Sequence, residues 1–500
     1  MSTLIPPPPY TAPELATLYP PTLKLQQVQI LLRHGERTPV SARFKNTGLA
    51  TYWPYCSAAN SLHSVILYAD HSWSTLDWKR RLETFGPGDT PELVAKGADA
   101  VCQPGELTDK GRETTLALGE RIRKLYVEQL KFLPPTFDAA ESIYLRATPI
   151  PRALESVQQA FTGLYPPSTR AAGLPPPQIV QRLPYEETLF PNEGACKRFA
   201  ELANLFADRS AVKWNDSAEM EFLNSKLGSY MPAKSPKVKV DSHPRLSGIM
   251  DTINATLAHG PATRLPGVFY EEEVIKTIDR VCVEEWFAGY PESKEYRALG
   301  IGAAMGDVTQ RMVEHATATG KYDGQGEAGF KMSLSGCHDT TLAAAITSLG
   351  VFDTTKDRWP NYTSSVAFEL FKRDSPPSTA SASTQPAPTR PSWWNSLFSI
   401  ASPAATPSTT PVARTPSSAL PTSTKSAMEG HYVRLRYNDR PVTLPYCAAQ
   451  PDRHLEGNPQ FCTLAAFKEA TDAFTPKDWK GECVMNLGKP ADVVERPPGL

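Results

Sequence analysis

Short apolar segments alternate with amphipathic helical segments towards both ends of this 500-residue chain, and this alternation restricts the folds that it can adopt. The segments at 25–32, 142–146 and 330–336 read as strands, and a helical pattern follows each of them, after an insertion in the first case and directly in the other two. Strands that alternate with helices are typical of α/β domains. From about 180 to 300 the pattern is helical with loops. We therefore predict a three-layer α/β/α core with a mainly parallel sheet, plus an α-helical cap domain.

The same pattern suggests a domain organisation in which insertions interrupt one core. Residues 1–23 are proline-rich and are expected to form an extended arm. We assign the remaining ordered segments to two groups. The core takes 24–49, 106–180, 300–373 and 429–490, and the insertions 50–105 and 181–299 form the cap.

A segment rich in serine, threonine and proline lies between two strand-like segments. The segments at 364–373 and 431–442 are expected to pair as the arms of a hairpin. Residues 374–428 between them hold few charged or apolar side chains, so we predict a disordered insertion. An apolar island at 391–401 interrupts it. It is either an interfacial helix that makes peripheral membrane contact or a partner-docking motif.

Charge, hydropathy and cysteine usage exclude several classes of protein. The formal net charge is −1, which does not favour nucleic acid as a partner. No run of about 18 apolar residues predicts a transmembrane segment. The N-terminal residues lack the pattern of a signal or transit peptide, so we expect a cytoplasmic protein whose eight cysteines are reduced thiols. The cysteines show no metal-ligand spacing.

Polar side chains of the catalytic type follow three of the predicted strands. In open α/β sheets, ligands bind outside the carboxyl ends of the strands, so these side chains are expected to meet at one site. The candidates are Arg33, His34 and Arg37 after the first strand, Arg146 at the end of the second, and His338 and Asp339 after the third.

These residue types suit phosphoryl transfer without a metal. Guanidinium groups offer forked donors that match phosphate oxygens. A neutral imidazole such as that of His34 can attack phosphorus, because neighbouring cations lower its pKa. A protonated Asp339 can give its proton to the leaving oxygen, which predicts an acidic optimum. Gly35 is expected to allow a close backbone approach to the ligand. A single arginine or histidine near a strand end is usually only a surface or capping residue, so the prediction depends on the whole set.

The string "RHGERTP" with a downstream "HD" resembles the histidine acid phosphatases, branch 2 of the histidine phosphatase superfamily. The resemblance covers about residues 25–490 apart from the insertion. It implies that His34 becomes a phosphohistidine, that Asp339 donates a proton, and that no cofactor is needed. It further implies that the phosphate is bound by Arg33, Arg37, Arg146 and His338.

A narrower resemblance concerns helices and loops, among them "LFPNEGAC" and "SLGVFDTTKDRWP", which are similar to the lysophosphatidic acid phosphatase subgroup. It implies a small-molecule phosphomonoester, and specifically a lysophospholipid, as substrate. A phytase or broad-specificity acid phosphatase is the alternative, and a non-catalytic phosphate-binding scaffold is a second one. Trp53, Trp73 and Trp78 either line a pocket for an acyl chain or pack within the cap.

Overall fold

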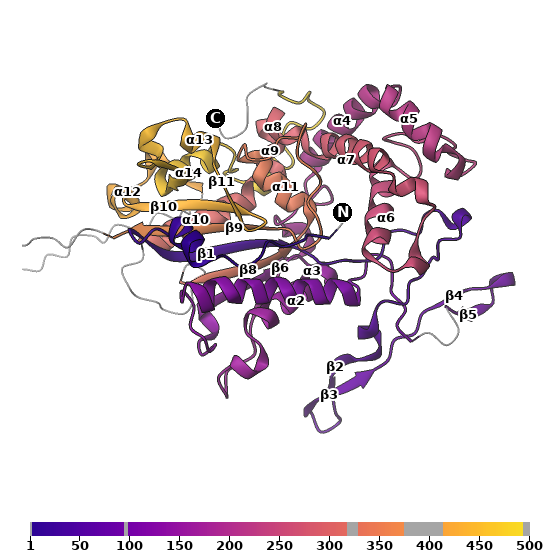
Figure 1. The fold of residues 1–500 in the computed structure, drawn as a ribbon, viewed down its shortest axis with the longest axis horizontal. Coiled ribbons are helices and arrows are strands. Elements are labelled where there is room, and N and C mark those ends of the chain that lie inside the picture. The colour runs from indigo at the N-terminus through magenta and orange to yellow at the C-terminus, as the bar shows by residue number, and fades with distance from the viewer. Residues whose placement is uncertain (1–2, 95–98, 318–328, 375–413, 494–500) are drawn as a thin grey trace, which may run out of the picture.

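A computed structural model of the chain describes residues 3–94, 99–317, 329–374 and 414–493. Its central sheet runs in the order β12-β13-β10-β9-β1-β8-β6-β7, with β11 paired to β10 (Figure 1). The strands are β1 (Leu23–Arg33), β6 (Ile143–Ala147), β7 (Ile179–Val180), β8 (Met332–Cys337), β9 (Ser365–Arg373), β10 (His431–Tyr437), β11 (Arg440–Val442), β12 (His454–Leu455) and β13 (Asn458–Thr463).

The four strands β1, β8, β6 and β7 are parallel neighbours, whereas β9 and the later strands pair antiparallel. Strand β1 is central and is buried from Gln27 to Arg33, and the side-chain amides of its two buried glutamines find acceptors, because Gln27 donates to the Phe330 carbonyl and Gln29 to the Val308 carbonyl. The prediction of an α/β sheet with helices packed on it is confirmed.

Helices α2 (Asp109–Arg123) and α3 (Pro151–Leu164) cover one face of the parallel strands (Figure 1). The side chain of Thr108 caps α2 by accepting a hydrogen bond from the Gly111 amide, and α3 begins at a proline. The two helices pack closely where Gly119 of α2 meets Ala160 of α3. A Cβ atom at position 119 would lie only 2.0 Å from the Ala160 carbonyl oxygen, so this packing requires a glycine. This contact fixes α2 and α3 as one layer.

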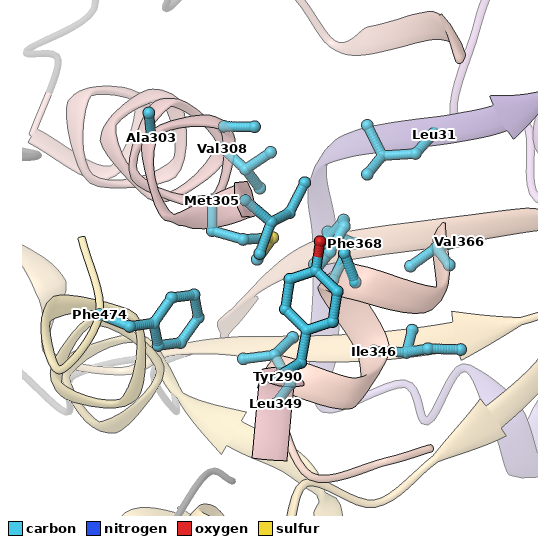
Figure 2. Packing of buried hydrophobic residues seen from close by; sticks show 14 of the residues in the cluster. Leu31, Tyr290, Ala303, Met305, Val308, Ile346, Leu349, Val366, Phe368 and Phe474 are labelled. Atoms are coloured by element: carbon cyan, nitrogen blue, oxygen red, sulfur yellow. The ribbon is translucent and has the colours of Figure 1, made fainter. Parts of the chain in front are cut away.

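The opposite face of the sheet carries α10 (Ala303–Thr317), α11 (Asp339–Ser348) and α14 (Leu464–Asp472), with the shorter α12 (Thr422–Met428), α13 (Pro445–Ala448) and α15 (Trp479–Glu482). Figure 2 shows the core between them, where Leu31 and Phe368 of the sheet lie among Met305, Val308 and Ile346 of the helices. The sheet therefore has helices on both faces, and α11 starts directly at the end of β8.

The helical pattern expected between 180 and 300 is observed. It contains α4 (Lys197–Trp214), α5 (Ala218–Leu227), α6 (Leu246–Ala258), α7 (Glu272–Phe287), α8 (Gly289–Glu292) and α9 (Lys294–Arg297). Helices α4 to α7 enclose a second apolar core, which includes Met220, Ile249 and Ile278, whereas Tyr290 of α8 and Tyr296 of α9 belong to the first core. In the described part of the chain, no helix has the length and apolar character needed to cross a membrane.

Residues 50–105 do not contribute helices to a cap, contrary to the prediction. Their described part forms two β-hairpins, β2 (Leu62–Leu67) with β3 (Trp73–Trp78) and β4 (Glu83–Phe85) with β5 (Pro91–Leu93), which project from the body (Figure 1). The tryptophans separate accordingly: Trp53 is buried, whereas Trp73 and Trp78 are 69% and 50% exposed. The three rings therefore do not form one pocket.

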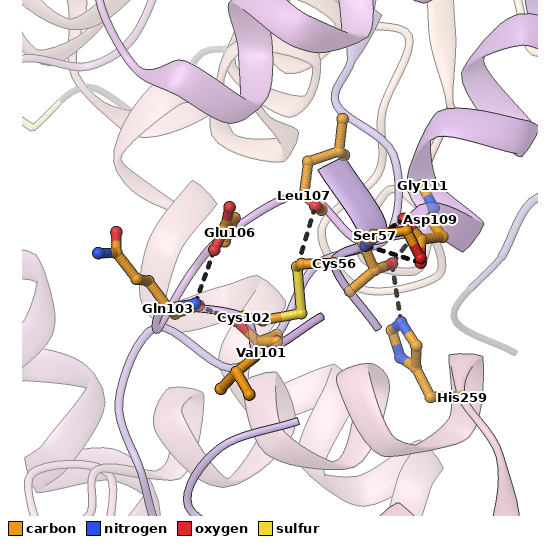
Figure 3. The surroundings of a disulfide bond; sticks show 12 residues. Cys56, Ser57, Val101, Cys102, Gln103, Glu106, Leu107, Asp109, Gly111 and His259 are labelled. Atoms are coloured by element: carbon orange, nitrogen blue, oxygen red, sulfur yellow. Dashed lines mark hydrogen bonds between the residues drawn. A yellow bond between two sulfur atoms is a disulfide. The ribbon is translucent and has the colours of Figure 1, made fainter. Parts of the chain in front are cut away.

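The cysteine prediction was also wrong, because six of the eight cysteines form disulfides. The pairs are Cys56–Cys102, Cys196–Cys483 and Cys447–Cys462, and Cys282 and Cys337 are free and buried. The bond between Cys56 and Cys102 closes the base of the hairpin region (Figure 3). The paired residues lie between 15 and 287 positions apart, so the fold rather than a local motif brings them together.

The strands that flank the Ser/Thr/Pro-rich insertion pair as predicted, since β9 and β10 are antiparallel neighbours. The prediction of disorder was wrong for residues 414–428, and its remainder at 375–413 lies outside the described residues. Residues 414–428 are ordered and include α12, Leu420 is buried in the core, and Ser417 bonds to Asp472. The predicted helix at 391–401 lies outside the described residues.

The N-terminal arm is not simply extended, because it contains α1 (Ala12–Leu18). Arg434 donates to the Leu18 carbonyl, and Arg436 donates to the Tyr10 hydroxyl at 2.9 Å. At the other end of the arm, the hydroxyl of Thr3 donates to Glu36 at 2.6 Å. The arm therefore lies across the sheet and reaches the "RHGER" segment.

Candidate active site

The ends of β1, β8 and β6 lie side by side, as the candidate site requires. In the parallel register Arg33 lies opposite Cys337, and Gly336 lies opposite Ala147. The His34 amide continues this pairing by donating to the Cys337 carbonyl at 3.1 Å. The predicted residues after β1 and those after β8 are therefore brought together, and the ring centres of His34 and His338 lie 5.5 Å apart.

His34 is held in one tautomer by its own backbone. Its Nδ1 lies 2.8 Å from the carbonyl oxygen of Gly35, and a carbonyl can only accept, so Nδ1 carries the proton. Burial and the charges of Arg152, Arg33 and Arg37 hold the pKa of His34 well below its ordinary value. The ring is therefore neutral, with the lone pair on Nε2 available as a nucleophile.

Gly35 is required by the packing of the turn that follows His34. A Cβ atom at this position would lie 2.2 Å from the carbonyl oxygen of Gly111 in the first turn of α2. The amide of Gly35 donates to the Ser156 hydroxyl of α3 at 3.1 Å. The turn after His34 is thus clamped between α2 and α3, and this packing requires a glycine at position 35.

Arg33 and Asp339 form a buried ion pair with 2.6 Å between Nη2 and Oδ2. The guanidinium of Arg33 also lies 4.2 Å from the centre of the Tyr362 ring and donates to the Pro360 carbonyl. Burial raises the pKa of Asp339, but Arg33, the Trp359 indole and Arg37 outweigh it and hold that pKa below the ordinary value.

Arg37 is oriented by a carboxylate from the helical region. Its Nη1 lies 2.6 Å from Oδ1 of Asp251 in α6, and the Tyr362 ring lies 6.0 Å from its guanidinium. The other oxygen of Asp251 accepts from Arg43 at 2.9 Å and from the Val40 amide at 3.1 Å. Asp251 was not predicted, and no local motif marks it.

His338 faces His34 from the start of α11. Its Nε2 lies 3.0 Å from the Thr148 hydroxyl, which follows β6, and the ring of Phe190 packs edge-on at 5.8 Å. Burial, followed by the charge of Arg152, lowers the pKa of His338. His338 is therefore a neutral hydrogen-bonding group beside His34.

Arg146 does not join this cluster, so its predicted phosphate contact is not supported. Side chains of a strand alternate between faces, and Arg146 lies on the face opposite to Leu145 and Ala147, which pack under α2 and α3. Its guanidinium binds the fully buried carboxylate of Glu187 and lies 3.8 Å from Asp307. The arginine is neutralised within the core below the site.

Arg152 supplies the third guanidinium instead. It is the second residue of α3, and among charged neighbours it has the largest effect on both His34 and His338. Burial and the charge of Arg37 lower its pKa to about 10. Its guanidinium forms no ion pair with any described residue. The signal in the sequence is its place in the first turn of the helix that follows β6, where a side chain reaches the strand ends.

The cluster retains unused hydrogen-bond donors. The Nε atoms of Arg33, Arg37 and Arg152 are buried and have no hydrogen-bond partner among the described residues. Three guanidiniums face the two carboxylates of Asp339 and Asp251, so the site carries an excess of positive charge around a neutral imidazole. A dianionic phosphate satisfies both the donors and the charge. Within the described ranges, no group of three histidine, cysteine or acidic side chains is arranged to hold a metal.

Comparisons with known proteins identify the family of the chain. The model of the histidine phosphatase superfamily (branch 2) matches residues 24–385. A probable acid phosphatase of Schizosaccharomyces pombe is 37% identical over 93% of this chain and 95% of its own length. Human lysophosphatidic acid phosphatase type 6 is 25% identical over 70% of this chain and 74% of its own.

Among solved structures, a phytase of Hafnia alvei in complex with tartrate superposes with a TM-score of 0.52. It covers 93% of this chain and 99% of the phytase at 12% identity, which shows a shared fold alone. The family match spans the three strand ends, and the Schizosaccharomyces relative aligns over nearly the whole chain. The chain therefore belongs to branch 2 of the histidine phosphatase superfamily and is an enzyme of the acid phosphatase type.

Proposed function

We propose that this enzyme hydrolyses phosphomonoesters through a covalent phosphohistidine at His34. The supporting observation is the hydrogen bond from Nδ1 of His34 to the Gly35 carbonyl, which leaves a neutral Nε2 among three guanidiniums. The phosphate docks on Arg33, Arg37 and Arg152, with His338 as a fourth contact. These groups stabilise the equatorial oxygens during transfer.

The proposed chemistry has two displacements. In the first, Nε2 of His34 forms a bond to phosphorus while the bond from phosphorus to the ester oxygen breaks, and a protonated Asp339 gives its proton to the departing oxygen. In the second, the ionised Asp339 takes a proton from water. The resulting hydroxide oxygen bonds to phosphorus, the N–P bond breaks, and phosphate and neutral His34 are released.

The pKa of Asp339 in the free enzyme lies below its ordinary value, so the carboxyl is ionised before substrate binds. A phosphate dianion between Arg33 and Arg37 cancels the positive charges that keep Asp339 ionised. We therefore propose that substrate binding promotes protonation of Asp339, which favours turnover at acidic pH.

Lysophosphatidic acid is the substrate that we favour. A groove of about 740 Å³ lies between the loop at 41–46 and the segments at 231–233 and 243–248. Phe44, Met231 and Pro244 give it apolar lining, and it adjoins the site because Arg43, which lines it, binds Asp251. A mixed basic and apolar groove beside Arg37 suits a phosphomonoester with an acyl chain.

The alternative is a phytase or broad-specificity acid phosphatase, which the exposed Lys45 and His243 in the same groove would suit. A comparison of kcat/KM for lysophosphatidic acid, glycerol phosphate, phytate and phosphotyrosine decides between these substrates. We expect lysophosphatidic acid to exceed glycerol phosphate at least tenfold, because only the acyl chain differs. Equal values for these two would contradict acyl recognition, and a preference for phytate would favour the alternative.

The sequence alone left open a non-catalytic phosphate-binding scaffold, which membership of the acid phosphatase family disfavours. Such a scaffold predicts phosphate binding without turnover of any ester in this panel. The intact pair of His34 and Asp339 argues against it, because a binding protein has no need for an oriented nucleophile beside an acid.

A further inference from the structure

We propose that Trp359 is a positioning residue for Asp339, which fixes the carboxyl oxygen that delivers the proton to the leaving group. The proposal rests on the proposed role of Asp339 as the acid. Trp359 lies in the loop between α11 and β9. The indole nitrogen Nε1 donates to Oδ2 of Asp339 at 2.9 Å.

The two oxygens of Asp339 have unequal surroundings. Oδ2 accepts from the Trp359 indole and lies 2.6 Å from Nη2 of Arg33, whereas Oδ1 accepts, among the described residues, only from the Thr340 amide, at 2.9 Å. Two donors on Oδ2 disfavour a proton there, because that oxygen must act as an acceptor for both. Oδ1 is therefore the oxygen that carries the proton. In the transfer step the Oδ1–H bond breaks, the ester oxygen gains the proton, and Asp339 becomes a carboxylate.

Trp359 is itself held from several sides. Its ring lies 4.8 Å from Phe287 and 5.8 Å from Trp286, both in α7. Its main-chain amide lies 3.3 Å from Oδ1 of Asp279 in the same helix. The carbonyl of the next residue, Pro360, accepts from Arg33. The dipeptide at 359–360 thus positions both members of the Arg33–Asp339 pair against the helical region.

Several charged or titratable groups surround Asp339 and influence its proton. Arg33 and Arg37 lie at the end of β1 and in the turn after it, and Arg152 lies in α3. His338 lies at the start of α11, and Tyr362 lies in the loop before β9. Asp279 lies behind Trp359, and burial raises its pKa to about 6. Loss of the indole N–H removes a donor that favours the carboxylate, so the pKa of Asp339 rises while the other groups stay in place.

Trp359→Phe tests the proposal, because phenylalanine keeps an aromatic ring against Phe287 and removes the N–H donor together with one ring of the indole. We expect the alkaline limb of kcat for an alkyl phosphate, which reports the pKa of Asp339 in the substrate complex, to move up by about one pH unit. At the acidic plateau we expect kcat for the alkyl phosphate to fall about tenfold, and that for p-nitrophenyl phosphate to change less than about twofold, since a good leaving group needs no acid.

Two control variants distinguish the positioning role of Trp359 from an effect of ring packing and from the titration of Asp279. Trp286→Phe changes a neighbouring ring that has no bond to Asp339, and it should leave the limb in place. Asp279→Asn keeps an oxygen for the Trp359 amide, so a limb that disappears in this variant would belong to Asp279 and overturn the proposal. If Trp359→Phe folds poorly, benzothienylalanine at 359 replaces the indole N–H by sulfur with the same ring shape.

An unchanged limb, or equal losses on both substrates, would overturn the positioning role while the hydrolytic function stands. A wild-type enzyme that turns over neither substrate would instead contradict the proposed function, and the role of Trp359 would fall with it. Normal turnover of p-nitrophenyl phosphate by Trp359→Phe, together with a shifted alkaline limb for the alkyl phosphate, supports the hydrolytic function and the positioning role of Trp359.

Discussion

Nη1 of Arg37 lies 2.6 Å from Oδ1 of Asp251, so a carboxylate of α6 orients an arginine that follows β1. Both side chains are almost fully buried. Because the pair connects the helical region to the strand ends, we expect Asp251 to control phosphate binding without touching the phosphate.

Asp251→Ala should lower kcat/KM for p-nitrophenyl phosphate by about 10- to 100-fold, since a charge-assisted hydrogen bond contributes roughly 1.5–3 kcal/mol. Asp251→Asn, which keeps an oxygen towards Arg37, should lose less. Steady-state kinetics of the two variants measure the effect. Identical losses, or a change in kcat/KM below twofold for the alanine variant, would show that Arg37 needs no such support.

Arg152 and Arg146 should respond in opposite ways to removal. Arg152→Ala should reduce kcat/KM by about 100-fold with little change in stability, because its guanidinium pairs with no described side chain and is available for the phosphate. Arg146→Ala should instead destabilise the protein by about 3–5 kcal/mol, because it leaves the buried Glu187 carboxylate unpaired.

Chemical denaturation and steady-state kinetics of both variants provide the comparison. Arg146→Met is the matched control, because methionine removes the positive charge and keeps much of the side-chain volume. If Arg146→Ala folded normally and lost activity while Arg152→Ala stayed active, the assignment of the third guanidinium to Arg152 would be wrong.

The buried neutral histidine makes stability depend on pH. The folded chain keeps His34 neutral because its pKa lies well below 6.5, whereas the unfolded chain protonates it as the pH falls below that value. The unfolded state then binds more protons, so the free energy of unfolding decreases as the pH falls below about 6.5.

His34→Gln should remove this contribution. Between pH 7 and pH 5, in a buffer without phosphate, its Tm should fall less than that of the wild type. Differential scanning calorimetry across this range is the measurement. Parallel curves for the two proteins would mean that His34 titrates at its ordinary pKa in the folded state.

The disulfides predict a simple thiol count. Denatured but unreduced protein should react with two equivalents of a thiol reagent, at Cys282 and Cys337, and reduced protein with eight. Reduction should lower the stability by about 2–4 kcal/mol per bond. Eight reactive thiols in the unreduced protein would restore the expectation from the sequence. Disulfides are typical of oxidising compartments, so two thiols would disfavour the cytoplasmic location.

The strand ends of the site were predictable because an apolar strand that runs into a charged turn is a local signal. It placed His34 and Asp339 directly after two strands, β1 and β8, which are neighbours in the sheet. The third arginine was not predictable in this way. Arg146 and Arg152 lie six positions apart in one segment, and only the alternation of β6 and the direction of α3 decide which of them faces the site.

Other features depend on distant parts of the chain. Asp251 and Trp359 reach the site from α6 and from the loop before β9, and neither has a spacing motif. The disulfide between Cys196 and Cys483 joins residues 287 positions apart. The order of residues 414–428 arises from their packing on α10 and α14, which their composition alone does not reveal.

The central claim is that His34 carries the phosphoryl group during turnover. Enzyme mixed with a phosphomonoester labelled in the phosphate should be quenched in alkali, where phosphohistidine survives, and then digested and mapped. We predict label on the peptide that contains His34, loss of the label in acid, and no label in His34→Ala. Label on another residue, or turnover by His34→Ala, would contradict the account.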